Sequence, residues 1–344
     1  MSILKMHLKK ITDILMSICS YAPCWGVIPK PEKYNRKEGI SALILLRNEP
    51  WIEPSILSIK DIVDEYIIVD CSTDNTPKKI VRIKNQENLN LKYVHIEPDY
   101  HKQMKIAIKL SSRKWLLRWD GDFIAYKSGI RNIKKIKDII QSLSKCRYYF
   151  IEFSVLNTEF DLLHVEKTPC HSEAYLFNYS PSLNKISFVR KLRSMIRRII
   201  TKRLPPRAPY LPFPLWYKRI ALDKTFAMHL RTVKSPLRLL ERKYQTYWGL
   251  LSSKEKQLFA NSFNEYVNYR VKKEFNMDDA KSASLKYINN MIRSKKLLMY
   301  DSDVWGNYPE ILNKYIKNKI GVNILNNDDF KNKLIEFLSQ SYSI

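Results

Sequence analysis

Two aspartates, Asp120 and Asp122, stand one residue apart where an apolar stretch of the sequence ends, in "LLRWDGDFIA" at residues 116–125. Two like charges at the end of a strand are unfavourable unless a cation neutralises them. Paired carboxylates suit a hard divalent cation such as Mg²⁺ or Mn²⁺, and Gly121 allows a tight turn that points both into one space. Such a cation could bridge nucleotide phosphates and stabilise a departing diphosphate. The alternative is a solvated turn.

Alternating strands and helices surround this pair and must position it. Thr76 and Pro77 are the expected N-cap and first residue of one helix. Strands are expected at 40–46, 65–70, 91–97, 114–119 and 147–157, with helices at 51–63, 77–85 and 101–112. This order predicts an α/β fold with a mostly parallel central sheet and helices on both faces. Such sheets bind ligands at the carboxyl ends of their strands, where the two aspartates lie.

The chain divides by pattern into three ranges, residues 1–36, 37–235 and 236–344. In the first, apolar residues recur at helical spacing with lysines between them, namely Leu4, Leu8, Ile11, Leu15 and Ile18. This amphipathic extension either packs on the main domain or lies on a membrane surface. The last range is expected to be helical, with a break near "DSDVWGNYP".

The net charge is the strongest compositional feature. The formal charge is +26, and residues 186–243 hold 16 Lys and Arg against the acids Asp223 and Glu241. An excess of this size implies an anionic partner, such as nucleic acid, an anionic membrane or a phosphorylated substrate. Only seven glycines occur and none is clustered, which argues against a Rossmann dehydrogenase and a P-loop enzyme.

Cysteine usage and hydropathy bear on the compartment. The five cysteines are odd in number and show no zinc-type spacing, so we expect free structural thiols in a reducing compartment. No apolar run is long enough for a transmembrane helix, and no secretory signal is expected. The expected location is cytoplasmic, peripheral on the inner face of the membrane.

Three segments together resemble family 2 glycosyltransferases of the GT-A fold. They are "ALILLRNEP", "EYIIVDCSTDNT" and "KWLLRWDGDF", which agree with that family in order and spacing between residues 40 and 125. In the family the first strand ends in a polar segment, the second in an acid before a "GSTDNT"-like turn, and the fourth in a DxD. The resemblance implies a Rossmann-like GT-A domain, followed here by the helical C-terminal region.

The resemblance also implies roles for the strand-end residues. Asp70 would accept a hydrogen bond from the nucleotide base, typically the uracil imide; its other expected role is capping the following turn. Asp120 would face the ribose or the metal, and Asp122 would be the principal ligand of Mn²⁺ or Mg²⁺. The resemblance implies that Arg47, Asn48 and Glu49 line the pocket for the base and ribose. The alternative is that they form a charge pair on the surface. Cys71 stands in place of the family's glycine.

Downstream of residue 125 the candidates are fewer. An inverting transferase needs a general base for the acceptor hydroxyl. Glu173 is the first candidate, because it precedes a short apolar strand as carboxylates in the second half of the family do, and Asp223 is the rival; a surface salt bridge is the alternative for both. His229 resembles a late histidine that completes the metal or diphosphate site in some relatives, with a buried core histidine as the alternative.

The resemblance thus implies an inverting, metal-dependent hexosyltransferase that uses a nucleotide-sugar donor, UDP-sugar being favoured, and a glycan or lipid-linked glycan acceptor. Surface polysaccharide or lipopolysaccharide synthesis is the expected setting. The basic segment 188–219 is expected either to contact an anionic membrane or to form a solvated helix face. A nucleic-acid-binding protein is the alternative from charge alone, although no nucleic acid partner is expected. A phosphatase of the haloacid dehalogenase type fits poorly, because its DxD follows the first strand.

Overall fold

The computed structural model describes residue 14 and residues 17–166, 172–185, 213–214, 216–248, 251–260, 262–295 and 298–315. The chain divides into two compact units, which are considered separately. One comprises Met1–Val155, Pro169–His229 and Gly306–Ile311, and the other Leu156–Thr168, Leu230–Trp305 and Leu312–Ile344.

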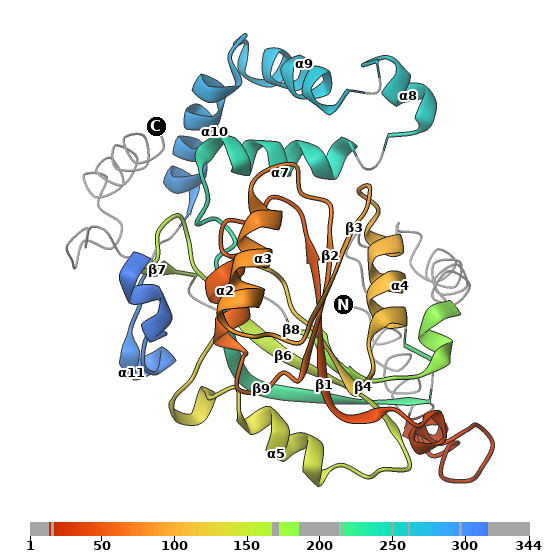
Figure 1. Ribbon diagram of the computed structural model, residues 1–344. Helices are drawn as coiled ribbons and strands as arrows, with labels where there is room; N and C mark the ends of the chain where they lie inside the picture. Colours follow the sequence, from red (N-terminus) through yellow and green to blue (C-terminus); the bar gives the residue numbers. More distant parts are fainter. Residues whose placement is uncertain are drawn as a thin grey trace. The chain divides into compact units, whose positions relative to one another are not determined.

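An eight-stranded sheet forms the first unit, in the order β3-β2-β1-β4-β8-β6-β9-β5 (Figure 1). Strands β1 to β4 are neighbours and run parallel, and the other pairs described are antiparallel. The strands are β1 Lys37–Leu46, β2 Glu65–Asp70, β3 Leu91–His95, β4 Arg113–Arg118, β5 Phe123–Ala125, β6 Tyr148–Asn157, β8 Ser172–Asn178 and β9 Tyr217–His229. This confirms the expected α/β class.

Helices cover both faces of the parallel strands, because alternate side chains of each strand point to opposite faces. Leu43 and Ile67 pack with Met104 of α4, whereas Ile44 and Ile68 pack with helices on the other face. The helices on that other face are α2 Ile52–Ser58, α3 Thr76–Gln86 and α5 Lys135–Ser142, and α4 spans Tyr100–Leu110. Short 3₁₀ turns lie at Pro31–Tyr34, Gly129–Arg131 and Pro181–Lys185.

The start of α3 differs from the expectation. Asn75 is the N-cap and makes no side-chain capping bond, so the prediction that Thr76 is the cap is wrong. The Thr76 hydroxyl instead accepts from the backbone N–H of Glu49 at 3.1 Å, while the backbone N–H of Thr76 donates to the Asp74 carboxylate at 2.9 Å. The hydroxyl therefore connects two loops rather than starting a helix.

At the amino ends of the strands, the buried carboxylate of Glu65 connects β1, β2 and β3. It accepts from the Ser41 hydroxyl at 2.6 Å, from the Ser112 N–H at 2.8 Å and from the Lys92 ammonium at 2.6 Å. The Ser112 hydroxyl also donates, at 3.0 Å, so each carboxylate oxygen has two donors, which offsets the cost of burying the charge.

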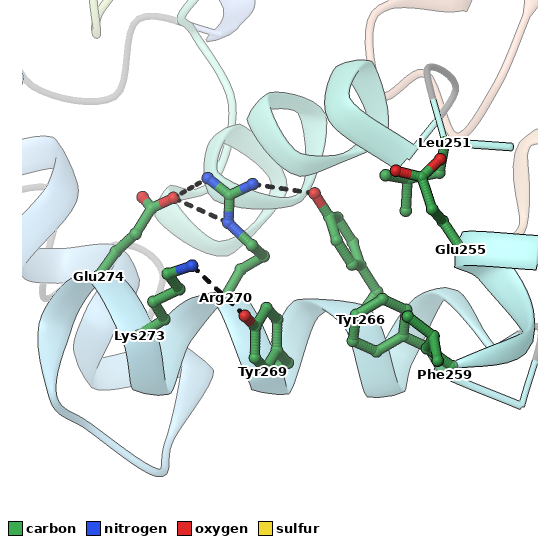
Figure 2. Close-up of a pocket in the computed structure, with 9 residues that line it drawn as sticks. Leu251, Glu255, Phe259, Tyr266, Tyr269, Arg270, Lys273 and Glu274 are labelled. Carbon is green, nitrogen blue, oxygen red and sulfur yellow. Dashed lines mark hydrogen bonds and ion pairs between the residues drawn. The ribbon is translucent and has the colours of Figure 1, made fainter.

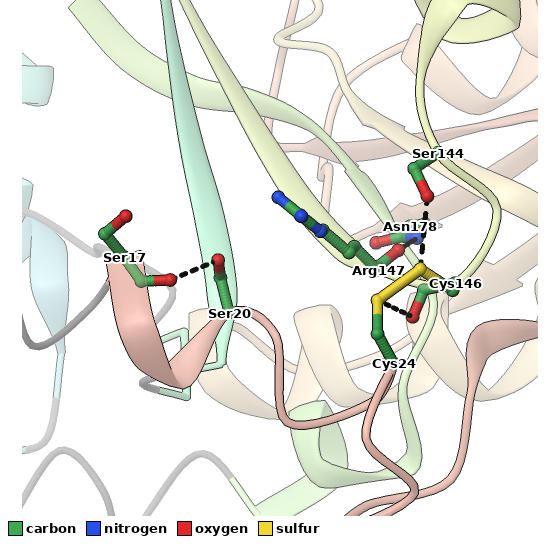
Figure 3. The surroundings of a disulfide bond; sticks show 7 residues. All are labelled: Ser17, Ser20, Cys24, Ser144, Cys146, Arg147 and Asn178. Atoms are coloured by element: carbon green, nitrogen blue, oxygen red, sulfur yellow. Dashed lines mark hydrogen bonds between the residues drawn. A yellow bond between two sulfur atoms is a disulfide. The ribbon is translucent and has the colours of Figure 1, made fainter.

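The N-terminal segment is fixed to the sheet by a disulfide between Cys24 and Cys146, whose Cα atoms are 5.3 Å apart (Figure 3). The guanidinium of Arg147 lies 3.4 Å from the centre of the Tyr21 ring, and the Tyr148 hydroxyl donates to the carbonyl of Pro29 at 2.8 Å. The expectation that all cysteines are free thiols is therefore wrong for this pair. Among the described residues, Cys19 and Cys71 are free.

The second unit is mostly helical and has its own aromatic core. Tyr244 of α7 and Tyr266 of α9 are buried and pack with Val271 and Ala283. Its elements are β7 His164–Val165, α7 Pro236–Trp248, α8 Ser253–Gln257, α9 Phe263–Phe275, α10 Ala280–Ser294, β10 Leu298–Met299 and α11 Ser302–Trp305. A 3₁₀ turn at Glu310–Tyr315 begins in the first unit and ends in the second. For the described residues between 236 and 315 the expected helical character is confirmed, except that β10 pairs with β7.

The sequence led to two expectations about membranes, one for the basic segment 188–219 and one for membrane-spanning helices. The basic segment 188–219 lies almost wholly outside the described residues. In the part of the chain that the structure covers, no helix is both long and apolar enough to cross a bilayer.

Candidate active site at the carboxyl ends of the strands

The two aspartates lie in the turn between β4 and β5 and differ in exposure. The Asp120 side chain is 44% exposed, whereas Asp122 is almost completely buried. The carbonyl of Asp120 accepts from the Ser55 hydroxyl at 3.2 Å and from the Phe123 N–H at 3.0 Å, which fixes the turn. One carboxylate therefore faces solvent while the other is held inside.

Gly121 is needed here for space. A Cβ atom at this position would lie 2.5 Å from Cδ2 of Leu46 and 2.9 Å from Cγ of Glu49. The turn therefore packs directly against the carboxyl end of β1. We expected a glycine here because it allows a tight turn. The structure shows a different reason, which is that the two loops approach too closely for a side chain.

His229, the last residue of β9, is brought to this turn by its pairing with Phe123 in β5. Its Nε2 lies 3.5 Å from Oδ2 of Asp122, and its ring packs against Phe123 with centroids 4.9 Å apart. Within the described residues, no group of three or more His, Cys, Asp or Glu side chains is arranged to hold a metal ion. The expected ligands thus converge as a pair, with Asp120 beside them.

A buried arginine beside the aspartates was not identified from the sequence. Arg118 ends β4, its side chain is nearly buried, and its Nε lies 3.8 Å from Oδ1 of Asp120. Its guanidinium also lies over the Tyr175 ring, 4.9 Å from the centroid. The available signal was a cationic residue directly after the apolar run of the strand, in "LLRWDGD".

The two candidate bases occupy different places. Glu173 lies near the start of β8, opposite Phe153. Because β8 runs antiparallel to β4 and Leu176 faces Leu117, Glu173 lies past the end of β4, on the edge that carries the aspartates. Asp223 is exposed on β9, six residues before His229, which is roughly 20 Å of strand. The structure therefore brings only Glu173 to this edge.

Asp70 ends β2 and is completely buried. Its Oδ1 accepts from the N–H and hydroxyl of Ser72, at 2.9 and 2.5 Å, and its Oδ2 accepts from the Tyr93 hydroxyl at 2.9 Å. Burial and the hydrogen bond to Asp70 raise the pKa of the Tyr93 hydroxyl, which stays protonated as the donor. The carboxylate thus caps the following turn, which is one of its two expected roles.

The loop after β1 is hydrogen-bonded to the turn that follows β2. Asn48 has a left-handed backbone, with φ of 50°; its side-chain oxygen accepts from the Thr73 N–H at 2.7 Å, and its own N–H donates to Ser72 at 2.6 Å. Glu49 is mostly buried and Arg47 is partly buried. All three predicted residues therefore lie at the edge that carries Asp70 and Asp122.

A separate hollow of about 360 Å³ lies in the helical unit, between α8 and α9 (Figure 2). Tyr269 and Leu258 border it, and Arg270 crosses its wall, with ion pairing to Glu274 and a 3.0 Å hydrogen bond to the Tyr266 hydroxyl. Of its charged side chains, Arg270 and Glu274 pair with each other, Lys273 donates to the Tyr269 hydroxyl at 3.4 Å, and Glu255 accepts from the N–H of Ser252 at 2.7 Å. The sequence predicted no role for these residues.

Comparisons with known proteins give distant structural likenesses only. No protein-family model and no curated protein matches the chain. The crystal structure of S. aureus TarS matches with 16% identity, a TM-score of 0.35, 74% of this chain covered and 43% of that chain; this chain thus spans less than half of its length. The crystal structure of 4-diphosphocytidyl-2C-methyl-D-erythritol synthase from Anaerococcus prevotii matches at 13% identity and a TM-score of 0.33, covering 57% of this chain and 89% of the other.

The inositol-1-phosphate CTP transferase from T. maritima matches at 6% identity and a TM-score of 0.34, covering 57% of this chain and 90% of the other. At these TM-scores, function has to be argued from the chain's own residues.

Proposed function

We propose that this chain is a metal-dependent glycosyltransferase that moves a hexose from a nucleotide sugar, UDP-sugar being favoured, to a glycan or lipid-linked glycan, with inversion. The observation that carries the proposal is the meeting of Asp122 and His229 at 3.5 Å, at the sheet edge where α/β folds bind ligands. The setting is surface polysaccharide synthesis at a membrane.

The residues present fit a divalent cation. Asp122 offers a held carboxylate and His229 an imidazole nitrogen, a mixed set that favours Mn²⁺ over Mg²⁺, because Mg²⁺ takes oxygen ligands. When bound, the cation neutralises charge that develops on the departing nucleoside diphosphate. The half-exposed Asp120 is placed to share this cation or to contact the ribose.

The chain's own groups supply the remaining steps. Arg118 is a fixed cation beside Asp120 and adds positive charge for the diphosphate. The joined loops at Asn48 and Ser72 form one wall of the nucleotide site, with Asp70 holding that wall from beneath. Glu173 accepts the proton of the acceptor hydroxyl as that oxygen attacks the anomeric carbon from the face opposite the leaving group, which gives inversion.

Thermal shift measurements test the proposal with nucleoside diphosphates and nucleotide sugars, each with and without Mn²⁺. We expect a rise in Tm for one nucleotide only when Mn²⁺ is present, because a ligand that binds the folded state stabilises it. Asp122→Asn should lose this rise and all turnover while keeping the Tm of the unliganded protein. Asp223→Asn is the matched control and should behave as wild type. Full turnover in Asp122→Asn would exclude the metal assignment.

A further inference from the structure

Exposed apolar side chains are concentrated in the short segment that the disulfide fixes to the sheet. Of the twelve large hydrophobic side chains exposed in the described part of the chain, five lie between Ile14 and Val27. Trp25 is 63% exposed, Val27 72% and Ile18 53%. Soluble proteins seldom expose clusters of this kind unless the cluster contacts something.

The segment is held in a way that leaves these side chains outward. The disulfide fixes Cys24 to Cys146, and Tyr21 lies beneath the Arg147 guanidinium. Trp25 stacks on Tyr21 with ring centroids 5.8 Å apart, yet most of its surface remains open. The segment is therefore anchored through Tyr21 and Cys24. The side chains of Trp25 and Val27 are not needed for this anchoring, so packing onto the sheet does not explain why apolar residues stand at these positions.

The charges around the segment indicate what it contacts. Lys30, Lys33 and Lys145 are exposed, and Glu32 is the single acid between residues 14 and 36. A second copy of a chain with a formal charge of +26 would be repelled from this surface. An anionic bilayer satisfies both features, since lysines attract its headgroups and tryptophan favours the boundary between headgroups and acyl chains.

We infer that Trp25, Val27 and Ile18, flanked by Lys30 and Lys145, form a docking surface for an anionic lipid bilayer, with the Cys24–Cys146 disulfide holding it in place. This surface is distinct from the proposed nucleotide site, and binding there requires no catalysis. Its apolar side chains lie within residues 1–36, for which the sequence left packing on the main domain and a membrane surface as alternatives, and it differs from the basic segment 188–219.

Vesicle flotation of the full-length oxidised protein tests the inference, with phosphatidylcholine vesicles made with and without phosphatidylglycerol. We expect the wild type to float only with the anionic vesicles and to be released by salt. Trp25→Ser/Val27→Ser should bind about tenfold more weakly or worse, because two side chains lose their apolar burial. The matched control is Val81→Ser/Ile130→Ser, which replaces side chains 54% and 61% exposed elsewhere in the same unit, and it should bind as wild type.

Three outcomes would overturn the inference. They are wild-type protein that fails to float with anionic vesicles, equal flotation of wild type and Trp25→Ser/Val27→Ser, and equal weakening by the control pair. Sedimentation velocity of the same proteins tests the alternative that a second copy of the chain binds this surface. A wild-type dimer that becomes monomeric in Trp25→Ser/Val27→Ser, with vesicle binding unchanged, would make the surface a contact between copies. Because the two side chains are exposed, both double variants should keep the wild-type Tm, and nucleotide-dependent shifts should persist in both.

Discussion

At the scale of single residues, the site depends on close packing between two loops. Gly121 has no side chain, and the side chains of Leu46 and Glu49 at the end of β1 occupy the space that a Cβ atom would take. The turn that carries Asp120 and Asp122 is thereby fixed to the loop that carries Asn48. Small changes in packing here should move the carboxylates, although no charged group is altered.

Gly121→Ala is expected to lower stability by about 1–3 kcal/mol, because a methyl group would overlap Cδ2 of Leu46. Turnover should fall as well, since the aspartates shift with the turn. Urea denaturation and a transfer assay measure the two effects.

A double-mutant cycle with Leu46→Ala shows whether the overlap is the cause. Removing the Leu46 methyl groups opens the space, so Gly121→Ala should cost less in that background than in wild type. An identical cost in both backgrounds would mean that the proposed overlap is not the source of the loss.

The sequence revealed the parts of the site that depend on strand ends alone. Asp120, Asp122 and Asp70 follow apolar strands, so their position at one edge was predictable. Arg118 was missed because a cationic residue that follows a short apolar run does not by itself indicate that its side chain is buried. The capping of the turn by Asp70 was one of two open alternatives, and the Ser72 and Tyr93 contacts that show it depend on tertiary packing.

At the scale of elements, Glu65 joins three parallel strands through one buried carboxylate. Burial opposes its charged form, but hydrogen bonds from Lys92, Ser41 and Ser112 outweigh that cost and hold the pKa of Glu65 below its ordinary value of 4.5. A carboxylate whose pKa is lowered by folding stabilises the protein above its unfolded pKa. That contribution is lost as the pH falls through the folded value.

Glu65→Gln is therefore expected to lower the free energy of unfolding by about 1–3 kcal/mol at neutral pH. The difference from wild type should shrink as the pH falls below 4.5 and through the lowered pKa of Glu65, because the wild-type carboxylate then becomes protonated. Urea denaturation across this range measures it.

Glu38→Gln is the matched control, because Glu38 pairs with Lys114 but its side chain is 76% exposed. Its effect should be under about 1 kcal/mol. A Glu65→Gln deficit that stays constant across the pH range would contradict the role given to the charge.

The elements themselves were predictable to different degrees. The β1–β4 half follows from alternating apolar strands and amphipathic helices, each a local pattern. The antiparallel half could not be predicted in this way. Its pairs join β8 and β9 to β4, β5 and β6, which are distant in sequence, so no local pattern indicates them. The length of β9 was also hidden, and it is this length that places Asp223 far from His229.

At the scale of the whole molecule, the disulfide joins the N-terminal segment to the sheet across 122 residues of sequence. The sequence could not predict this pair, since an odd number of cysteines with no regular spacing does not define partners. A cross-link over so long a loop restricts the unfolded chain strongly.

Cys24→Ser is expected to lower the free energy of unfolding by about 2–5 kcal/mol under non-reducing conditions, as measured by urea denaturation. Cys19→Ser, which removes a free thiol, is the control and should leave the midpoint unchanged. Adding a reductant should lower the wild-type midpoint to that of Cys24→Ser and leave the variant where it was. A wild-type midpoint that does not respond to reductant would contradict the expected stabilisation.

The same bond changes the connectivity of the chain. Residues 24–146 become a closed covalent ring that contains β1 to β5 and helices α2 to α5. A protease that cuts once in an exposed loop of this ring, such as the one at Lys127 and Ser128, opens the circle without releasing a fragment. The nicked protein should migrate as an intact chain on a denaturing gel until a reductant separates its two pieces.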